Sequence, residues 1–533
     1  MKLLFAPSGK RVIPYPPVGI AILAAQLRAK GVDAEVCDLE IELAARHVGG
    51  EETLLHRRAV DPLEAVAGEL DPELREYADH LWSLLGSDGQ APLGISVMGF
   101  EQVASALLLA RTALEQGRRV IFGGQFWTER SASEALHLLA PFGSVSVTIG
   151  DGWEAVAAFA AGADVSAVPN TTSSVGAGEV VAGPRVQAKS LPPQPRYDWV
   201  AWDAYERFGS VTYRDDRRVR RAHLYVWDKQ CNFRCAFCRV ATGSRAVLTP
   251  PVSVAESFAE LRAADVTQLN FMTNELNPSR TYLLRLLDQL EKRGADGSDW
   301  FTYVRADRLE QDDFARIRAL GGRLARYGLE SGSQRLLDLM RKDYDVATMS
   351  RTLKNAAAED VWNHVNLLVG FPGEVEADID DTIRFLEQNA HTVHSVRINP
   401  FYLPPDTPIA RAPEEFGIQL TEFASGWWKY EQQDGSQPDA EAVVRRIERI
   451  SQACVDLGIG FAGTDPFFLL DVISRYDSVE KGLGHLKQEF PIFWVPAPTD
   501  VYKAAIGGYE TTADWRSTAL KRGRNYSLSI CTD

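Results

Sequence analysis

Three cysteines, Cys231, Cys235 and Cys238, stand within eight residues and form a C-x3-C-x2-C pattern. Phe237 comes directly before the third cysteine. Three thiolates at this spacing can hold three irons of one iron-sulfur cube and leave the fourth iron without a cysteine ligand. Because an open iron can bind a reactant directly, the pattern predicts a catalytic centre.

A zinc site is the alternative explanation for clustered cysteines. Structural zinc usually takes four ligands, commonly two separated C-x2-C pairs or a set of cysteine and histidine. The remaining cysteines, Cys37, Cys454 and Cys531, are scattered, and no histidine follows Cys238 within fifteen residues. The sequence therefore favours an iron-sulfur cluster over zinc.

The cysteine loop must be positioned by the segment around it, residues 206–410, in which strand-like runs alternate with helical patterns. Strands are expected at 222–227, 268–272, 300–304, 325–328, 364–369 and 396–398. Six parallel strands with outer helices make a partial (β/α)6 barrel, related to the TIM barrel, and such barrels carry their chemistry at the carboxyl ends of the strands. The cysteine loop leaves the first strand at that end.

Residues 1–165 show the alternation of a doubly wound, Rossmann-like parallel sheet in an α/β fold. Its strands are expected at 3–6, 32–37, 93–97, 119–122 and 145–149, the last of the sheet. Ligands of such sheets bind at the carboxyl ends of the strands. Small or polar residues stand there, although glycines after strands can also simply make turns.

The other two segments carry weaker signals. Residues 166–205 are expected to be a linker, and residues 411–533 a small, mostly helical C-terminal domain with an amphipathic helix at 440–457. Aromatic residues are dense between 427 and 494. They either fill a small core or pack on the barrel, or they cover the barrel mouth above an aromatic or apolar substrate.

Composition narrows the class of protein. A length of 533 residues suggests about three domains. The net charge of −15 argues against nucleic acid or an anionic membrane as the main partner. The basic run 217–221 is the exception, and it is interpreted as a solvated linker or a contact to a cofactor phosphate.

The expected compartment follows from the cysteines and the apolar runs. Six cysteines in a chain of 533 residues, three of them clustered, fit a reducing environment rather than a disulfide scaffold. The start of the chain is interpreted as a buried strand rather than a signal peptide, because Pro7 and Gly9 break its apolar run. No apolar run reaches the length of a membrane-spanning helix. We therefore expect a cytoplasmic protein.

Two further motifs make the barrel segment resemble the radical S-adenosylmethionine (SAM) superfamily. They are Arg326–Arg335, with the sequence RYGLESGSQR, and Asn366–Glu374, with the sequence NLLVGFPGE. The resemblance implies a [4Fe-4S] cluster whose open iron is approached by the amino and carboxylate groups of SAM. It also implies a set of SAM-binding residues, namely Phe237, Asn274, Glu275, Arg305, Glu330, Ser331, Val369 and Gly370.

Glu275 departs from the family pattern. The turn Phe271–Glu275 replaces the commoner glycine-rich or double-aspartate turn. Glu275 or Asn274 would bind the amino group of SAM. Alternatively, the Glu275 carboxylate ligates the open iron, which would keep SAM off that iron and disfavour a radical, as in the thiostrepton-pathway tryptophan methyltransferase branch. Tyr303 and Arg305, at one strand end, are the candidate catalytic residues.

The first domain resembles the cobalamin-binding domain that precedes many radical SAM domains. The resemblance rests on 14–28, 94–96, 122–124 and 150–154. It implies that the corrin is lined by Ser8, Ser96, Gly99, Gly123, Gly124, Gln125, Phe126, Gly150 and Glu154. The chain has no D-x-H-x-x-G element, and Phe126 and Trp127 stand where the family usually has a histidine, so the lower face of cobalt would not be held by histidine.

The resemblance implies a cobalamin-dependent radical SAM C-methyltransferase. It would methylate an unactivated or weakly nucleophilic carbon of a small molecule in natural-product metabolism, such as antibiotic biosynthesis, through methylcobalamin and the [4Fe-4S]/SAM centre. The alternatives are a rearrangement, cyclisation or oxidation without methylation, a polar methyl transfer without radicals, and a cobalamin or cluster sensor. Expected partners are a small-molecule substrate and an electron donor such as flavodoxin or ferredoxin, and the protein is expected to be a monomer.

Overall fold

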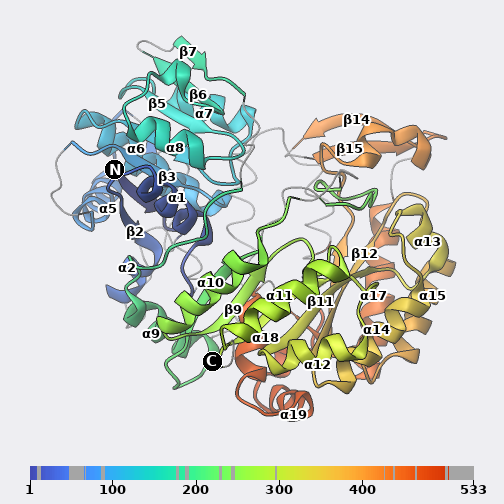
Figure 1. Ribbon diagram of the computed structural model, residues 1–533. Coiled ribbons are helices and arrows are strands. Elements are labelled where there is room, and N and C mark those ends of the chain that lie inside the picture. The colour runs from blue at the N-terminus through green and yellow to red at the C-terminus, as the bar shows by residue number, and fades with distance from the viewer. Residues whose placement is uncertain are drawn as a thin grey trace. The chain divides into compact units, whose positions relative to one another are not determined.

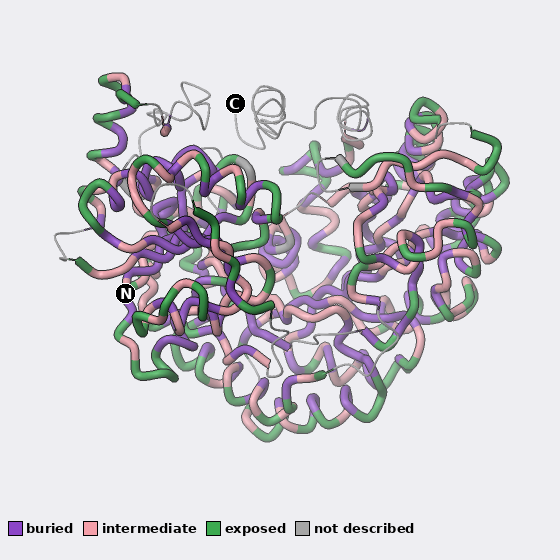
Figure 2. The backbone as a smooth tube through the Cα atoms, turned by 90° about the horizontal axis from the view of Figure 1, so that it is seen from above, coloured by how far each residue is buried: buried purple, intermediate pink, exposed green. Residues whose placement is uncertain are grey.

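The computed structural model of the chain describes residues 1–8, 14–46, 65–66, 68–85, 90–175, 179–185, 191–226, 231–241, 247–294, 297–424, 427–435, 439–462, 465–497 and 502. The chain divides into two compact units, which run over Met1–Arg220 and Arg221–Ala513. Both units are built on a seven-stranded sheet (Figure 1). In Figure 2 the strands of each sheet are mostly buried, whereas the outward turns of the helices are exposed.

The first unit is a doubly wound sheet with the strand order β2-β1-β3-β4-β5-β6-β7. Its strands are β1 (Lys2–Phe5), β2 (Glu35–Asp38), β3 (Leu93–Ser96), β4 (Val120–Gly123), β5 (Val145–Thr148), β6 (Thr171–Val175) and β7 (Glu179–Ala182). Its helices include α1 (Val18–Ala29), α2 (Leu39–Arg46), α5 (Pro72–Ser83), α6 (Val103–Glu115), α7 (Glu129–Leu139), α8 (Trp153–Ala160) and α9 (Trp202–Tyr213). β1 to β5 are parallel, as expected.

Alternation along β1 shows how the helices cover both faces of this sheet. Leu3 and Phe5 pack with α1 and α8 on one face. Leu4 points to the opposite face and packs with α5, α6 and α7. Strands that are covered on both faces are expected to be apolar throughout, and both β1 and β3 are buried along their whole length.

Residues 166–205 differ from the expected linker. β6 pairs antiparallel with β5, and β7 pairs antiparallel with β6, so 145–149 is not the last strand of the sheet. The sequence of β6, TTSSV, lacks the apolar residues that mark a buried strand. Its buried hydroxyls are paired instead, as when Ser146 Oγ and Ser173 Oγ lie 2.8 Å apart.

The second unit confirms the expected partial barrel. Its strands are β8 (Arg220–Tyr225), β9 (Val266–Met272), β10 (Asp299–Val304), β11 (Gly322–Glu330), β12 (Trp362–Val369), β13 (Ser395–Pro400) and β16 (Gly460–Phe461), adjacent in that order. The helices that follow β8 to β12 are α10 (Pro251–Ala263), α11 (Arg280–Lys292), α12 (Gln311–Ala319), α13 (Gln334–Leu339), α14 (Val346–Ala358) and α15 (Glu376–Gln388). β9 to β13 and β16 run parallel.

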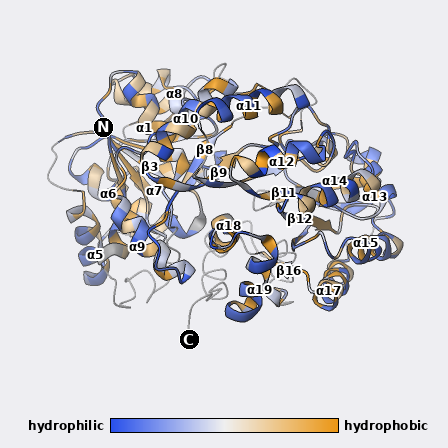
Figure 3. Cartoon of the chain, turned by 60° about the horizontal axis from the view of Figure 1, so that its bottom comes forward, coloured by the Kyte–Doolittle hydropathy of each residue, from blue (hydrophilic) through white to orange (hydrophobic). Residues whose placement is uncertain are grey.

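The segment after residue 411 forms part of the barrel unit. β16 pairs with β13, and α17 (Ala440–Leu457) packs against α15. α18 (Pro466–Ile473) contacts β9, β10 and β11. Figure 3 shows α10, α11, α12 and α14 on one side of the barrel sheet and α18 on the other. Besides these helices and α19 (Val479–Glu489), the segment contains an antiparallel hairpin of β14 (Ile418–Ala424) and β15 (Trp427–Gln432).

α18 fills the inside of the barrel near the start of the strands. The Phe467 ring lies 5.3 Å from the ring of Phe301 on β10 and 5.6 Å from that of His223 on β8. Asp471 pairs with Arg221, and these side chains are 0% and 1% exposed. Arg221 therefore anchors α18, which we call the plug helix. This role differs from the solvated linker or cofactor-phosphate contact that was expected for the basic run 217–221.

The Arg221–Asp471 ion pair leads to the first prediction. Asp471→Asn should lower the free energy of unfolding by about 3–5 kcal/mol, because it leaves the buried Arg221 charge without its carboxylate. Denaturant unfolding of wild type and variant measures this difference. Asp477→Asn is the matched control, since Asp477 pairs with Lys481 in solvent, and it should leave the unfolding midpoint unchanged. Equal midpoints for Asp471→Asn and wild type would contradict the anchoring role.

Among the described residues, we find no helix whose length and apolar character would let it cross a membrane.

Candidate active site

The cysteine loop is anchored by backbone hydrogen bonds to several parts of the barrel unit. Within the loop, the N–H of Cys231 donates to the carbonyl of Val240 at 3.0 Å. Between Cys235 and Cys238, Ala236 donates to the carbonyl of Met340 at 2.9 Å and accepts from the N–H of Ile409 at 3.0 Å. The loop is thus tied to the end of α13 and to the segment after β13.

The three cysteines are thiols in a protected position. Cys231 and Cys235 are 7% and 8% exposed, and Cys238 is partly buried. Burial, followed by the charge of Glu275, raises the pKa of Cys231 to about 12. Burial also raises the pKa of Cys238. Thiols with such raised pKa values are poor nucleophiles, whereas a bound metal would stabilise their thiolate forms.

The thiols do not form a site for a single metal ion. Within the ranges that the structure describes, no three His, Cys, Asp or Glu side chains could hold one ion together. An iron-sulfur cube distributes three cysteines over three irons, so its ligands need not converge on one point. The donor set of three thiols on one short loop, two of them buried and one partly buried, fits such a cube.

Glu275 lies directly beside the cysteine loop. Both of its carboxylate oxygens are 3.6 Å from Sγ of Cys231, and the residue is 4% exposed. The turn after β9 is held by the N–H of Leu276, which donates to the carbonyl of Tyr303 at 2.9 Å. This position allows both expected roles of Glu275, as a ligand of iron and as a contact of SAM. Asn274, in the same turn, is partly buried.

Arg305 packs against the cysteine loop. Its guanidinium lies 3.4 Å from the ring centre of Phe233, which stands between the first two cysteines. Its Nε donates to Asp307 Oδ1 at 2.7 Å, and its Nη2 donates to the carbonyl of Lys342 at 3.0 Å. Because a cation over an aromatic face is attractive, Arg305 fixes the loop. The carboxylate that it meets is that of Asp307.

Tyr303 and Arg305 do not act as a pair in the structure. The ring of Tyr303 lies against Arg326 of β11, at 4.7 Å from its guanidinium carbon. Arg305 turns instead to Phe233 of the cysteine loop. The two candidate catalytic residues therefore belong to different clusters.

Glu330 and Lys342 form a buried ion pair beside the cysteine loop. Lys342 Nζ lies 3.2 Å from Glu330 Oε1 and 5.6 Å from the ring centre of Phe237. Burial alone would lower the pKa of Lys342, but attraction by Tyr344, Glu330 and Cys235 outweighs burial and raises it. Glu330 has a φ of +64°, which is uncommon for a residue with a side chain and recurs at functional sites.

Sequence reasoning did not identify Lys342. It lies in the turn after α13, between two residues with positive φ, Arg341 and Asp343. These two left-handed residues mark a tight turn after the helix that follows Glu330. A lysine in such a turn, on the same βα unit as a candidate cofactor residue, is the signal that could have identified it.

Ser331 has a structural role in the turn after β11. Its Oγ lies 3.0 Å from Thr382 Oγ1 and accepts the N–H of Ser333 at 3.1 Å. The residue is buried. Ser331 therefore joins the turn that carries Glu330 to α15.

Glu374 controls the backbone at the end of β12, where Val369 and Gly370 are expected to meet SAM. Gly370 has a φ of +93°, and its N–H donates to Glu374 Oε2 at 2.8 Å. The carbonyl of Val369 accepts the N–H of Phe401 at 2.8 Å. Burial raises the pKa of Glu374 to about 7, although the Gly370 N–H and Arg446 oppose the shift.

The raised pKa of Glu374 predicts a pH dependence of stability. A carboxyl whose pKa is higher in the folded state binds its proton more tightly there, so its contribution to stability is complete below pH 4.5 and is lost as the pH rises through about 7. The shift corresponds to about 3 kcal/mol. Glu374→Gln should remove this loss, so that wild type weakens relative to the variant between pH 5 and pH 8. Denaturant unfolding at both pH values measures the difference, and an unchanged difference would contradict the prediction.

An apolar cluster joins the cysteine loop to the β14–β15 hairpin. It consists of Ala236, Leu336, Met340, Phe371, Phe401, Leu403, Ile409, Phe416 and Ile418, with Phe237, Trp428 and Tyr430 among the rings packed against it. The N–H of Trp428 also donates to the carbonyl of Leu403 at 2.9 Å. The hairpin therefore lies at the same end of the barrel as the cysteines.

In the first unit, the strand order creates a switch point. β1 has β2 on one side and β3 on the other, and open sheets of this kind bind ligands at the carboxyl ends of the strands where the order reverses. Phe5, Ser96 and Gly123 are aligned in register across β1, β3 and β4. Ser96 and Gly123 therefore lie at neighbouring strand ends, and Ser8 follows the end of β1 by three residues.

The glycines at these strand ends leave open space. An added Cβ would meet nothing within 4 Å at Gly123 or at Gly150. Gly124 has a φ of +101°, and a Cβ there would lie 2.1 Å from the carbonyl oxygen of Val97. Gly99 donates its N–H to Gln102 Oε1 at 3.2 Å. The open space beside Gly123 and Gly150 is compatible with the flat macrocycle that the sequence predicts.

The remaining candidate cobalamin residues make contacts in different parts of the first unit. Gln125 and Phe126 bond to the loop after β3, through Gln125 Nε2 to the Met98 carbonyl at 3.4 Å and Phe126 N–H to the Val97 carbonyl at 3.3 Å. Ser8 donates its N–H to the carboxylate of Glu40. Glu154 accepts from Gln26 of α1 at 3.1 Å, so the contacts of its side chain are with the covering helix.

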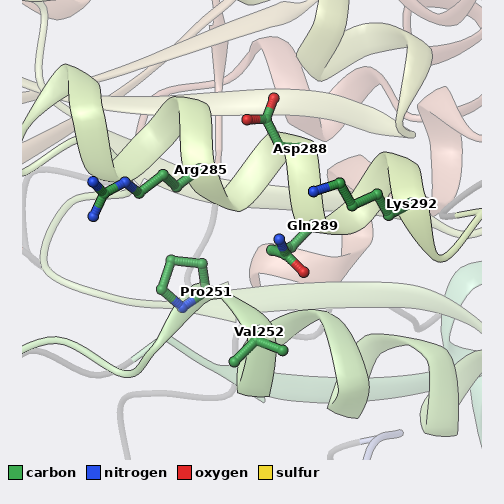
Figure 4. A pocket seen from close by; sticks show the side chains of 6 residues that line it. All are labelled: Pro251, Val252, Arg285, Asp288, Gln289 and Lys292. Carbon is green, nitrogen blue, oxygen red and sulfur yellow. The ribbon is translucent and has the colours of Figure 1, made fainter.

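A separate pocket lies between α10 and α11 (Figure 4). It is lined by Pro251, Val252, Arg285, Asp288, Gln289 and Lys292. Asp288 is already paired with Arg316 at 2.8 Å. Because both helices cover the outside of the barrel, this pocket is not the candidate active site.

Residues 228–386 match the family model described as the Radical SAM superfamily. This part of the chain is therefore a radical SAM domain, as the cysteines and the two strand motifs predict.

Curated relatives match only part of the chain. It is 25% identical over 241 residues to the tRNA-2-methylthio-N(6)-dimethylallyladenosine synthase of Aeromonas hydrophila, over 42% of this chain and 48% of that protein. It is 29% identical over 201 residues to the ribosomal protein uS12 methylthiotransferase RimO of Anaeromyxobacter sp., over 35% of this chain and 41% of that protein. The chain thus spans about half or less of the length of these relatives.

Two solved structures resemble the chain over nearly its whole length. The methyltransferase TsrM from Kitasatospora setae, with cobalamin and a [4Fe-4S] cluster bound, gives a TM-score of 0.55 at 15% identity over 98% of this chain and 99% of that one. The cobalamin-dependent SAM radical enzyme OxsB, with aqua-cobalamin and SAM bound, gives 0.59 at 12% identity over 99% of this chain and 79% of that one. At these identities the likeness concerns the fold, and it confirms the expected α/β architecture.

Proposed function

We propose that this chain, whose residues 228–386 form a radical SAM domain, is a cobalamin-dependent radical SAM C-methyltransferase that acts on a small molecule. The observation that carries the proposal is the combination of two sites in one chain. One is a loop of three thiols in a partial barrel, two of them buried and one partly buried, and the other is a set of strand-end glycines with open space beside them in a doubly wound sheet. The fold of this whole chain resembles that of TsrM and OxsB, whose structures contain cobalamin.

The residues that would hold the cofactors are those described above. Cys231, Cys235 and Cys238 would hold a [4Fe-4S] cluster, and Phe237, Glu330 and the end of β12 would contact SAM. Gly123, Gly124 and Gly150 would accommodate cobalamin. When bound, the cluster and SAM supply a radical that removes hydrogen from carbon, and cobalamin supplies a carrier for the methyl group.

The chain contributes orientation and exclusion of water. Arg305 fixes the cysteine loop through Phe233, and the Lys342–Glu330 pair orders the residues next to Phe237. Because the apolar cluster around Phe371 and Phe401 packs on the loop, it shields one side of the site from solvent. The β14–β15 hairpin, which packs on that cluster, would cover the substrate.

Polar methyl transfer without a radical is the second candidate mechanism. Glu275 supports it, because a carboxylate 3.6 Å from Cys231 Sγ is close enough to share the same metal group. An iron already ligated by Glu275 would not bind SAM. The rearrangement, cyclisation or oxidation alternatives need the same residues and have no separate support.

Methylthio transfer, the activity named for the curated relatives, is less well supported. One of those relatives acts on tRNA by its name, and the present chain carries a net charge of −15. Nucleic-acid binding depends on neutralising phosphates with lysine and arginine. We therefore propose a small-molecule substrate. The proposal further includes a cytoplasmic location, a monomeric state and an electron donor such as flavodoxin or ferredoxin.

The test is an anaerobic reconstitution with iron, sulfide and hydroxocobalamin, followed by incubation with SAM and a strong reductant. Mass spectrometry then quantifies S-adenosylhomocysteine and 5′-deoxyadenosine. Both products, with the first dependent on cobalamin, are the expected result. S-Adenosylhomocysteine alone would favour polar transfer, and 5′-deoxyadenosine alone would favour a reaction without methylation.

A further inference from the structure

The inner face of the barrel can be identified from side-chain contacts. Asn363 Nδ2 donates to the carbonyl of Leu353 on α14 at 2.8 Å, so Asn363 faces the outer helices. Residues alternate between the two faces of a strand, so His364 and Asn366 face the inside. Phe301, on β10, meets Phe467 of the plug helix α18, which identifies the inner face of that strand.

A row of polar side chains crosses this inner face. Tyr303, Arg326 and His364 are aligned in register across β10, β11 and β12. Arg397 of β13 is aligned with Asn366, two residues closer to the carboxyl end of β12. The row therefore lies between the plug helix and the carboxyl ends of the strands, where the cysteine loop is held.

The two arginines of this row lack acidic partners. Arg326 is 8% exposed, and its guanidinium lies over the ring of Tyr303. In the portion of the chain that the structure describes, neither Arg326 nor Arg397 forms an ion pair with Asp or Glu. The two charges also act on each other, because Arg397, after burial and the opposing effect of Tyr303, contributes to lowering the pKa of Arg326.

His364 lies between the two arginines and is also incompletely satisfied. Its Nδ1 lies 2.9 Å from Ser395 Oγ, but its Nε2 is buried and has no hydrogen-bond partner among the described residues. Burial, and then the charges of Arg326 and Arg397, lower the pKa of this imidazole well below its ordinary value. A neutral imidazole beside two guanidinium groups makes a polar, cationic environment, and no carboxylate of the described residues pairs with either arginine.

We propose that Arg326 and Arg397 bind an oxyanion of the substrate, a carboxylate or a phosphate. Arg326 is buried and Arg397 is partly buried, so their like charges repel each other with little screening by water, and an anion that binds between them removes that cost. Guanidinium groups form paired hydrogen bonds with planar carboxylates and with phosphates. The assignment rests on the proposed function, since it places the substrate between the plug helix and the cysteine loop. SAM also has a carboxylate, so the test must separate these two sources.

The test measures anion binding to the full-length protein by thermal unfolding and calorimetry, with benzoate and phenyl phosphate as probes and benzamide as the neutral match. At least one anion should raise the unfolding temperature of wild type by about 4 °C at saturation, and benzamide should not. Arg326→Gln and Arg397→Gln should each weaken anion binding at least tenfold. Arg326→Lys, which keeps the charge, should bind with an intermediate affinity. Arg384→Gln, on the outer helix α15, should bind as wild type does.

The unfolding temperature without ligand separates an anion-binding role of the two arginines from a purely structural role. Removal of an unpaired buried charge should leave the unfolding temperature without ligand unchanged or higher. A lower unfolding temperature for Arg326→Gln together with unchanged anion affinity would overturn the proposal, as would the absence of stabilisation by both anions. Displacement of the anion by saturating SAM would assign the arginines to SAM and overturn the substrate assignment. Arginine-dependent anion binding in a protein without methyl transfer would leave this inference standing and reject the proposed function.

Discussion

Cys235→Ala is expected to abolish assembly of the iron-sulfur cluster. The substitution leaves two thiols on the loop, Cys231 and Cys238, and a cube held by two cysteines loses the third of its protein-bound irons. After anaerobic reconstitution, the variant should retain background iron and sulfide and no absorbance band of a [4Fe-4S] cluster. Turnover of SAM should fall to the level of a control without protein.

Cys454→Ala provides the matched control for this experiment. Cys454 is also buried, and burial raises its pKa to about 12, but it lies on α17 and not on the cysteine loop. Its substitution should leave iron and sulfide content unchanged. If Cys235→Ala kept a full cluster, or if both variants lost it equally, the three-cysteine site would be rejected.

The sequence predicts the barrel well, because local patterns and chain order coincide there. Each expected barrel strand overlaps an observed one, and the strands are adjacent in the order in which they occur. In a barrel of consecutive βα units, neighbours in sequence are neighbours in space. The hydrophobic period of each strand and the order of the strands along the chain are therefore enough to predict the arrangement. The place of the cysteine loop after the first of these strands follows from the same rule.

The contacts of the candidate residues could not be predicted in this way. Arg305 was expected to meet a carboxylate and it meets that of Asp307, but its contact with the ring of Phe233, 72 positions away in the sequence, was not predicted. The backbone of Val369 and Gly370 is expected to contact the adenine of SAM, but the hydrogen bond from the Gly370 N–H to Glu374 was not predicted. Such pairings depend on which side chains meet across the barrel, and neither period nor spacing encodes that.

The C-terminal segment shows a signal that was present but ambiguous. α18 has the sequence PFFLLDVI, which is apolar on all sides. A helix of that kind is buried completely, whereas a helix on the surface of a separate small domain would be amphipathic. The single aspartate, Asp471, finds its partner in Arg221, a residue of the run that was interpreted as a linker. The two unusual charges explain each other only once the fold is known.

Gly124→Ala is expected to disrupt the first unit and with it the binding of cobalamin. Gly124 has a φ of +101°, and a Cβ would lie 2.1 Å from the carbonyl oxygen of Val97 and 2.7 Å from its carbonyl carbon. Left-handed backbone and overpacking against a rigid strand together cost about 2–5 kcal/mol. Denaturant unfolding measures the loss of stability, and absorption spectroscopy with hydroxocobalamin measures binding.

Gly123→Phe separates an effect on cobalamin binding from an effect on folding, because Gly123, unlike Gly124, has open space beside it. A Cβ at Gly123 meets nothing within 4 Å, so a large side chain there can extend into open space without displacing β4. If that space is where the corrin binds, Gly123→Phe should keep the unfolding midpoint of wild type and weaken hydroxocobalamin binding at least tenfold. Undiminished binding by a stable Gly123→Phe protein would show that cobalamin does not occupy the switch point between β1 and β3. The loss of both properties in Gly124→Ala would then reflect the backbone of the β4 turn alone.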